Sequence, residues 1–317
     1  MGQVDGAEAQ TAGRDVGRRA RRRGAGGGHV ARGVVFTLLG GALWGLSGTA
    51  SKFLMSSYAV DPLWLACARQ MGSCVLFMAA SALTARPQLA GCLRSPRDLG
   101  RIALMGVTAV MLMQVAYLEA IDLTNSATAT ILQSLGMLLV LAYACLRARR
   151  APRRREWCGV ALALVGTFLL VTGGDPGRLS LPAAGVAWGL ATALSNALLS
   201  ILPGKLIAWW GNFVVNALQM LVSGTALSLY YQPWAHMPSL DAVGLAVLCA
   251  IVVLGTFGAY ALYLQGVSDV GPLRAILLGT IEPVAATVAS IAWLGTSFSG
   301  AEIAGFALVI AMIFLTA

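Results

Sequence analysis

Glu282-Pro283 is the residue pair in this 317-residue sequence with the clearest chemical consequence. The pair lies inside a long apolar run, and an ionisable side chain at the centre of a membrane costs about 2.5–3.5 kcal/mol. Proline has no backbone N–H, so the carbonyl of Gly279 loses its helical donor. Burial away from water favours the protonated form of a carboxyl. Glu282 is therefore expected to carry a proton, to pair with a cation, or to brace a bend in its helix.

Lys52 and Arg69 are two further charged residues inside apolar runs, and each lies toward one end of its run. Either side chain could hold a substrate carboxylate. Long basic side chains near the end of a membrane helix more often extend to the headgroup region. We expect that behaviour or a structural ion pair, and keep both residues as candidate charge partners.

Uncharged polar and aromatic residues in the other runs form a candidate cavity lining. They are Trp44, Gln114, Tyr117, Gln133, Trp188, Ser195, Asn196, Tyr260 and Tyr263, to which Glu282 adds a charged member. Each alone is a weak signal, because polar side chains often bridge membrane helices. The aromatic rings would suit an aromatic or cationic ligand, since a cation–π attraction contributes about 0.5–2 kcal/mol.

Ten apolar runs must position these residues. Hydrophobic residues make up 58% of the chain and charged residues only 11%, against about 25% charged residues in soluble domains. The runs cover 33–56, 62–84, 101–120, 124–146, 156–173, 181–203, 210–231, 242–265, 272–295 and 299–317. Each approaches the ~20 residues with which an apolar helix crosses a bilayer. The sequence predicts an all-α integral membrane protein with ten transmembrane helices.

Basic residues predict how these helices are oriented. Of the 22 basic residues, 19 fall before residue 33, or in or directly beside the connectors that ten crossings place on the same side. Only Arg178 falls in an opposite loop. Because basic loops remain on the cytosolic side, we expect a multi-pass protein of the inner (cytoplasmic) membrane with both termini in the cytosol.

The first 32 residues form a tail rich in glycine, alanine and arginine. Such a segment has too little apolar content to fold alone, so residues 1–32 are expected to be disordered. A basic tail could bind RNA or acidic lipid. We expect instead that it fixes the orientation in the membrane, and predict no nucleic-acid partner.

The two halves of the chain resemble each other. The segment WGLSGTASK around Trp44 recurs as WGLATALSN around Trp188, Tyr117-Leu118 recurs as Tyr263-Leu264, and Glu156-Trp-Cys-Gly159 recurs as Glu302-Ile-Ala-Gly305, at offsets of 144–146 residues. The repeats 33–173 and 181–317 each hold five runs, so the second must be inverted relative to the first. Inverted repeats are typical of carriers that work by alternating access around a site at the bilayer midplane.

A family resemblance adds to this interpretation. The tryptophan-glycine start of each half, the run ATATILQ at 127–133 and Ile-Glu-Pro-Val at 281–284 resemble the EamA-type domains of the drug/metabolite transporter superfamily, over residues 33–317. The resemblance implies ten helices around a central cavity, and commonly the export of amino acids, other metabolites or toxic compounds.

The sequence departs from that family pattern in two places. Gly136-Met137 stands where Glu282-Pro283 stands in the second half, which predicts that the halves are mechanically unequal. Arg150 and Thr296 replace an acidic residue that such domains often carry before the last helix of each half.

Catalysis is the alternative from another class of protein. Gly45-Leu-Ser47-Gly48 fits the GxSG pattern of intramembrane serine proteases, but such a serine needs a histidine base within hydrogen-bond reach. The two histidines, His29 and His236, lie outside the apolar runs. The six cysteines show no metal-binding spacing. We therefore predict no enzymatic activity, no metal and no cofactor. A channel, a scaffold or a receptor stays an alternative.

Together these features predict a secondary active transporter that exports a small metabolite by alternating access. An amino acid or a related amphipathic compound is the leading substrate class. Glu282 and Pro283 are the candidates for proton coupling and gating. A uniporter or an uptake permease for a small polar metabolite is the alternative. The expected partners are the substrate and membrane lipid, with the chain as a monomer or a homodimer.

Overall fold

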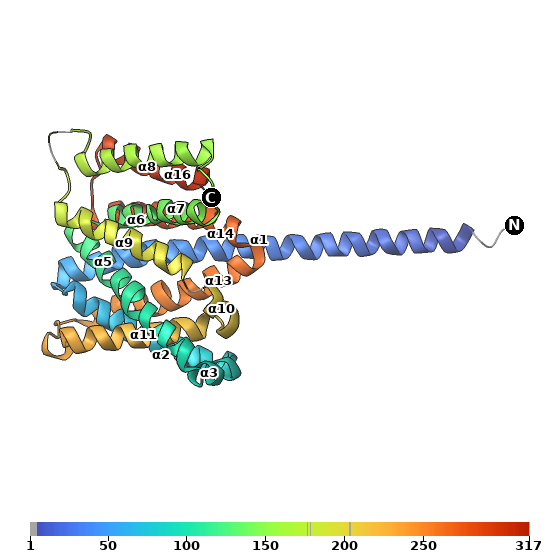
Figure 1. Ribbon diagram of the computed structural model, residues 1–317, viewed down its shortest axis with the longest axis horizontal. Helices are drawn as coiled ribbons and strands as arrows, with labels where there is room; N and C mark the ends of the chain where they lie inside the picture. The colour runs from blue at the N-terminus through green and yellow to red at the C-terminus, as the bar shows by residue number, and fades with distance from the viewer. Residues whose placement is uncertain (1–4, 176, 178, 203, 317) are drawn as a thin grey trace.

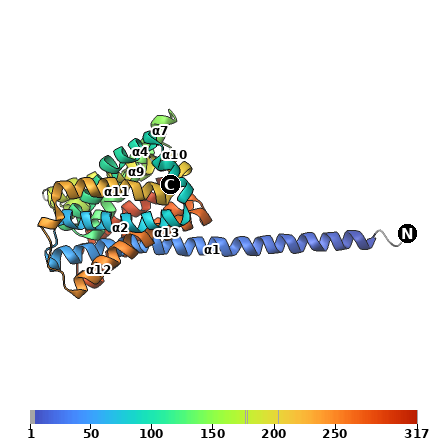
Figure 2. The same ribbon diagram turned by 90° about the horizontal axis from the view of Figure 1, so that it is seen from below.

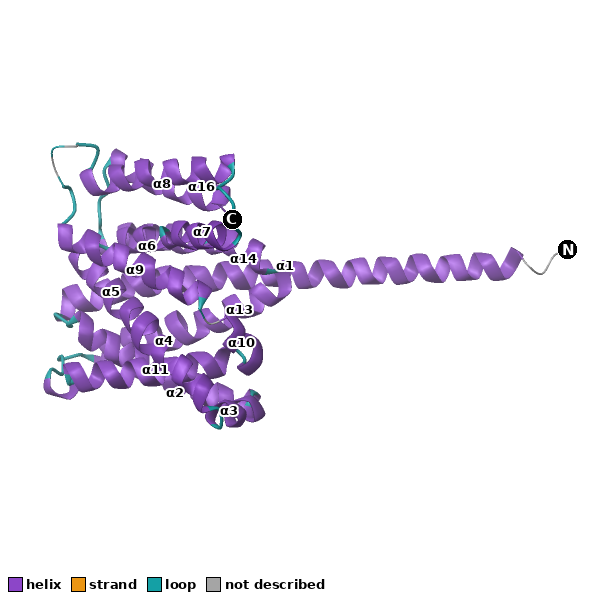
Figure 3. Ribbon diagram, in the orientation of Figure 1, coloured by secondary structure: helices purple, strands orange, loops and turns teal. Residues whose placement is uncertain are grey.

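The chain forms a bundle of helices joined by short loops in the computed structural model (Figure 3). The structure describes residues 5–175, 177, 179–202 and 204–316. Within these residues there is no strand. Helices suit these apolar runs because a helix satisfies its own backbone hydrogen bonds, which lipid cannot do.

Five crossings form the first half of the bundle. They are α1 (Asp5–Tyr58); α2 (Pro62–Thr84); α4 (Pro96–Met105), η1 (Gly106–Val110) and α5 (Met111–Leu123) in series; α6 (Ser126–Ser134) with α7 (Gly136–Arg147); and α8 (Arg154–Thr172). A short helix, α3 (Arg86–Leu93), connects α2 to α4. The third crossing begins at Pro96, five residues before the predicted run, because proline is well suited to the first turn of a helix.

Five equivalent crossings form the second half. They are α9 (Ala183–Ile201); α11 (Asn212–Tyr231); α12 (Ala242–Val252), η3 (Val253–Gly258) and α13 (Ala259–Val270) in series; α14 (Pro272–Gly279) with α15 (Ile281–Leu294); and α16 (Gly300–Thr316). The short helices α10 (Gly204–Trp210) and η2 (Pro233–Ala235) belong to connectors. In the described part of the chain nine segments are long and apolar enough to cross a membrane, and α16 is a shorter apolar helix of 17 residues. The all-α membrane fold is confirmed.

Both ends of the chain lie on one side of the bundle (Figure 1). We call this the terminal side, and the opposite side the far side. Figures 1 and 2 show α1 projecting beyond the bundle on the terminal side. The disorder expected for residues 1–32 differs from the described backbone, which is helical from Asp5 onward. Alanine and arginine, both frequent in this segment, are strong helix formers. Residues 1–4 lie outside the described residues.

The most extensive helix packing follows the repeat. α1 packs against α13 and α15, and α9 packs in the equivalent way against α5 and the α6–α7 segment. Two further pairs join equivalent helices, α8 with α16 and α2 with α11. Figure 1 shows these two pairs at opposite edges of the bundle. Exchanging the halves reproduces the same pairs, as an inverted repeat requires.

Each half interrupts the same two crossings at corresponding places. The third and eighth crossings contain the π-helical segments η1 and η3, which begin 147 residues apart. A π-helical turn inside an α-helix holds one extra residue. Figure 2 shows α12, before η3, inclined to α1. The fourth and ninth crossings are interrupted at Leu135 and Thr280.

The interruption of the fourth crossing corrects the expectation that the halves are unequal there. Residue 137, which is equivalent to Pro283, is a methionine, yet the helix still ends and restarts at Leu135. Gly136 follows the interruption, and glycine disfavours a continuous helix by about 1 kcal/mol relative to alanine. A Cβ atom at Gly136 would lie 2.5 Å from the carbonyl oxygen of Ala193 on α9. Close approach of α9 therefore requires glycine at this interruption.

The repeated glutamate caps the last helix of each half. The Glu156 carboxylate accepts a hydrogen bond from the backbone N–H of Arg153 at 2.5 Å and from the Arg150 guanidinium at 2.7 Å. The Glu302 carboxylate accepts one from the backbone N–H of Ser299 at 2.7 Å. Such caps satisfy N–H groups that a helix start leaves without a partner. Arg150 therefore has a structural role in this connector.

Candidate functional site

Glu282 lies in the first turn of α15, directly after the interruption at Thr280. Pro283 is tolerated here because the first turn of a helix needs no backbone N–H donor from it. α1 crosses α15 at this point so closely that a Cβ atom on Gly45 would overlap the carbonyl oxygen of Glu282. The expected break in the ninth crossing is present. It places Glu282 next to the break, in the first turn of the second segment of this crossing.

Three aromatic side chains from α1 and α13 lie around this turn. The Trp44 ring centroid is 5.1 Å from that of Tyr260 and 4.9 Å from that of Tyr263. The phenols of both tyrosines interact electrostatically with the Glu282 carboxyl. The residues described show no hydrogen-bond or ion-pair partner for Glu282. The carboxyl thus lies near the two tyrosines and is not paired with a cation in the described residues.

Arg69 on α2 belongs to the same region. Its residue is only 6% exposed, so its side chain does not extend to the surface, contrary to our expectation. The guanidinium interacts electrostatically with Tyr117 and Tyr260. Its Nε and Nη1 atoms are buried and have no hydrogen-bond partner in the described residues. Arg69 and Glu282 therefore face shared tyrosines without forming an ion pair with each other.

Lys52 behaves as a structural residue. Its Nζ donates to the backbone carbonyl of Asp122 at 2.5 Å and lies 3.8 Å from the Asp122 carboxylate. The contact joins α1 to the far-side end of α5. Three interpretations were open for this lysine: a substrate contact, extension to the headgroups and a structural pair. This contact agrees with the structural pair.

A far-side hydroxyl cluster, consisting of Thr49, Ser126 and Ser290, was not predicted. The Ser126 hydroxyl is 2.8 Å from that of Thr49 and 2.9 Å from that of Ser290. All three residues are buried, and they join α1, α6 and α15. Next to them the Tyr117 hydroxyl hydrogen-bonds that of Thr130 at 3.0 Å. Only the presence of hydroxyls near the far-side ends of three runs could have indicated this cluster.

The other predicted residues divide between packing and the α7–α9 region. Trp188 packs against the buried cluster that contains Tyr117. The Ser195 hydroxyl donates to a carbonyl of its own helix, that of Ala191, at 2.9 Å. Asn196 lies against Gly136, where α9 meets the interruption of the fourth crossing. Gln114 and Gln133 are partly buried. The structure therefore brings Trp44, Arg69, Tyr117, Tyr260, Tyr263 and Glu282 together, and leaves Ser195, Asn196 and Gln133 on the neighbouring helices.

The two sides of the bundle are packed differently. On the far side α6 packs against α15, and α1 packs against α5 and α6. The inverted repeat maps these pairs onto α14 with α7, and α9 with α13 and α14. Over the described residues none of these terminal-side pairs makes a comparable contact. Of these contacts, the one between α6 and α15 joins the two halves, so it closes the far side between them, and the terminal side is not closed in the same way.

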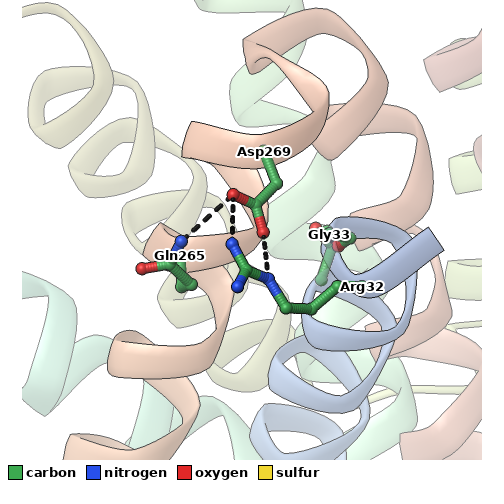
Figure 4. Close-up of polar contacts among 5 residues, drawn as sticks. Arg32, Gly33, Gln265 and Asp269 are labelled. Atoms are coloured by element: carbon green, nitrogen blue, oxygen red, sulfur yellow. Dashed lines mark hydrogen bonds and ion pairs between the residues drawn. The ribbon is translucent and has the colours of Figure 1, made fainter. Parts of the chain in front are cut away.

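An ion pair joins α1 to the last turn of α13 where α1 leaves the bundle on the terminal side (Figure 4). Arg32 Nε lies 2.9 Å and Nη2 3.0 Å from the Asp269 carboxylate oxygens. Gln265 donates to the same carboxylate at 3.1 Å. This contact lies within the α1–α13 unit and does not join the helices that separate on the terminal side.

Ten crossings in two like halves, with interrupted helices around buried charges, define a multi-pass membrane protein of the inverted-repeat carrier type. The EamA-like transporter family model matches residues 31–172 and 183–317. The chain belongs to the EamA-like transporter family.

Similar proteins are known from several bacteria. The uncharacterized inner membrane transporter YicL of Salmonella typhimurium (strain LT2) is 27% identical over 288 residues, which cover 91% of this chain and 96% of that protein. The uncharacterized transporter YwfM of Bacillus subtilis (strain 168) is 23% identical over 86% of this chain and 90% of that protein. A solved crystal structure aligns with a TM-score of 0.60 and 21% identity over 89% of this chain and 96% of its own, which shows a shared fold.

Proposed function

We propose that this protein is a secondary active transporter that exports a small metabolite, an amino acid or a related amphipathic compound, across the inner membrane. The terminal side would face the cytosol, since most basic residues fall on that side of the predicted topology. The relative YicL carries the name of an inner membrane transporter, which supports the same location.

Unequal packing of equivalent helix pairs carries this proposal. A carrier with two inverted halves exchanges its contacts between the two sides while its central site stays in place. Contact between α6 and α15, without an equivalent contact between α14 and α7, is what an inward-facing state requires. The outward-facing state would close α14 on α7 and separate α6 from α15.

The central residues suggest how transport is coupled to protons. In the inward-facing state the apolar part of the substrate would lie against Trp44, Tyr260 and Tyr263. Substrate binding would displace the proton of Glu282 to the cytosol. After the switch, the substrate leaves to the far side and a proton from there returns to the carboxyl. One proton then enters for each substrate molecule that leaves.

Transport by proteoliposomes under an imposed pH gradient tests this cycle. With a panel of labelled amino acids, the wild type should accumulate at least one against its gradient, because proton flow drives the exchange. Glu282→Gln should still equilibrate that substrate but lose its accumulation, since the amide cannot exchange a proton. Glu302→Gln, which alters only a capping acid at the start of α16, is the matched control and should accumulate as the wild type does.

Two results would contradict the proposal. If Glu282→Gln accumulates substrate like the wild type, the proton-coupling role of Glu282 is wrong and only transport itself stands. If the wild type moves no member of an amino-acid and metabolite panel, the substrate class is wrong.

A further inference from the structure

Arg69 is a buried cation whose charge the described chain does not compensate. Its residue is 6% exposed, and neither Nε nor Nη1 has a hydrogen-bond partner in the described residues. An arginine side chain cannot lose its proton in a protein. Removing one partner from a buried ion pair is strongly destabilising. A lone buried guanidinium is therefore unfavourable, and binding of an anion would stabilise it.

The acidic residues of the bundle do not supply that partner. The ion pairs of the described residues are Arg32–Asp269, Lys52–Asp122, Arg101–Asp98 and Arg150–Glu156. Glu282 interacts with the same tyrosines as Arg69, yet the two side chains are too far apart to count as an ion pair. The central site thus holds a cation and an acid near the same two tyrosines, Tyr117 and Tyr260, each without a charged partner in the described residues.

Ser73 adds a second donor on the same face of α2. Residues four positions apart lie next to each other on a helix, so Ser73 is one turn from Arg69. Ser73 is fully buried, and its hydroxyl also has no partner in the described residues. Arg69 Nε, Arg69 Nη1 and Ser73 Oγ are therefore unsatisfied donor atoms within one turn of α2, with no protein acceptor in the described residues. Acceptors for these donors would have to come from outside the described residues.

The chemistry of these donors selects the acceptor. A guanidinium presents planar, paired N–H groups along two edges, Nε with Nη2 and Nη1 with Nη2, and each pair matches the two oxygens of a carboxylate. A carboxylate at either edge therefore satisfies one of the two unpartnered nitrogens, Nε or Nη1, together with Nη2. A buried hydroxyl beside it adds a third hydrogen bond. Ala68-Arg69-Gln70-Met71 of α2 recurs in α11 as Ala217-Leu218-Gln219-Met220, with leucine in place of Arg69, so this donor set occurs once in the two halves. An off-centre site of this kind orients a ligand that has two different ends.

We propose that Arg69 and Ser73 form a carboxylate-binding subsite in the central site, and that the transported molecule carries a carboxylate. The transport part of this statement rests on the proposed function; the binding part does not. With the carboxylate on α2, the rest of the molecule extends toward Trp44, Tyr260, Tyr263 and Glu282. A molecule with an amino group at that end would place it near the Glu282 carboxyl.

Ligand-dependent thermal unfolding of the purified protein tests the subsite without requiring transport. The probes are three carboxylates of increasing size, acetate, 3-phenylpropionate and L-phenylalanine, each compared with its own amide. At least one carboxylate should raise the unfolding temperature of the wild type, and its amide should not. Comparison of 3-phenylpropionate with L-phenylalanine separates a simple organic acid from a ligand that also needs an amino group.

Three variants assign the effect to the subsite. Arg69→Gln should weaken carboxylate binding about tenfold to a hundredfold, as expected for loss of a charge-assisted hydrogen bond, and abolish the preference over the amide. Arg69→Lys keeps the positive charge but loses the paired N–H groups, so carboxylate binding should weaken while the preference for the carboxylate over its amide remains. This variant replaces Arg69→Gln in the test if Arg69→Gln does not fold. Lys52→Gln removes a membrane cation that already has a partner, and should bind carboxylates like the wild type.

The subsite is overturned if no carboxylate of the series stabilises the wild type, or if Arg69→Gln responds as the wild type does. Flux of the stabilising compound into proteoliposomes then separates the two proposals. Arg69-dependent binding without flux would keep the subsite and remove the transport function. Flux that is unchanged in Arg69→Gln would keep the transport function and remove the subsite.

Discussion

The far side and the terminal side of this bundle are built from equivalent helices, yet they differ in how the halves meet. On the far side, Thr49, Ser126 and Ser290 join α1, α6 and α15 by hydrogen bonds. The repeat places Ala193, Pro272 and Ala144 at the equivalent terminal-side positions, and none of these can supply a hydroxyl. The far-side contact therefore depends on hydroxyl residues that the sequence has on this side and lacks at the equivalent terminal-side positions. The two halves share a fold, but the side chains at their meeting points differ, and under the proposed transport cycle this difference would favour the conformation that is closed on the far side.

Locking the far-side contact should have the largest effect on transport. Ser126→Cys with Ser290→Cys replaces two hydroxyls whose oxygens are 2.9 Å apart, which brings the two sulfur atoms within reach of a disulfide. Oxidation should hold α6 on α15 and stop most of the transport in proteoliposomes, and a reducing agent should restore it. Each single cysteine variant is the control, since the chain already has six cysteines. Full transport by the oxidised double variant would show that this contact does not open during the cycle.

Weakening the far-side hydroxyl cluster should shift the equilibrium by a smaller amount. Ser126→Ala removes two hydrogen bonds, and each such bond between membrane helices contributes roughly 0.6 kcal/mol. The outward-facing population should therefore rise about fivefold or more. Spin labels at the exposed Leu123 and Ala292, in a cysteine-free background, would report this as a growing population at longer distance. Ser200→Ala, on an exposed hydroxyl of α9, should leave the distribution unchanged. If Ser126→Ala leaves the distance distribution unchanged, the hydroxyl cluster does not favour the conformation that is closed on the far side.

The far-side loop contact of Asp241 should have the smallest effect, and one that depends on pH. The backbone N–H of Gly244 and the hydroxyl of Tyr58 hydrogen-bond the Asp241 carboxylate and lower its pKa. Its stabilising contribution is therefore fully present above the ordinary pKa of an aspartate and is lost as the pH falls through the lowered value. Tyr58→Phe should reduce the unfolding temperature slightly at pH 7, and the difference should shrink in acid. A difference that grows in acid would contradict the assignment.

The sequence predicted the elements of the fold well because lipid imposes strong constraints on length and polarity. The ten runs, their inversion and the break at Glu282-Pro283 follow from hydropathy, an odd number of crossings per half and the missing N–H of proline. The interruption at Leu135 has no such marker. It depends on how closely α9 approaches Gly136, which a linear pattern does not contain.

The candidate site was only partly predictable for a related reason. A run that is apolar on all sides does not tell which face of the helix points inward. Trp44, Tyr260 and Tyr263 could be chosen by their chemistry, and the structure brings them together. Arg69 could not be assigned to the interior, because a position near the end of a run suits an extended side chain equally well. Its burial depends on the packing of α2 against α11, which a linear pattern does not contain.

The π-helical segments η1 and η3 lead to a different kind of conclusion, one about ancestry. An added residue in a helix rotates everything beyond it by about 100° relative to what precedes it. Such an insertion would disrupt a packed pair of helices unless the whole unit adjusted to it. Since both halves have the widened turn at the same register, a single five-helix ancestor that already contained it, and was then copied, is the most economical origin. Excising one residue from either turn should therefore damage a unit whose packing was shaped around it.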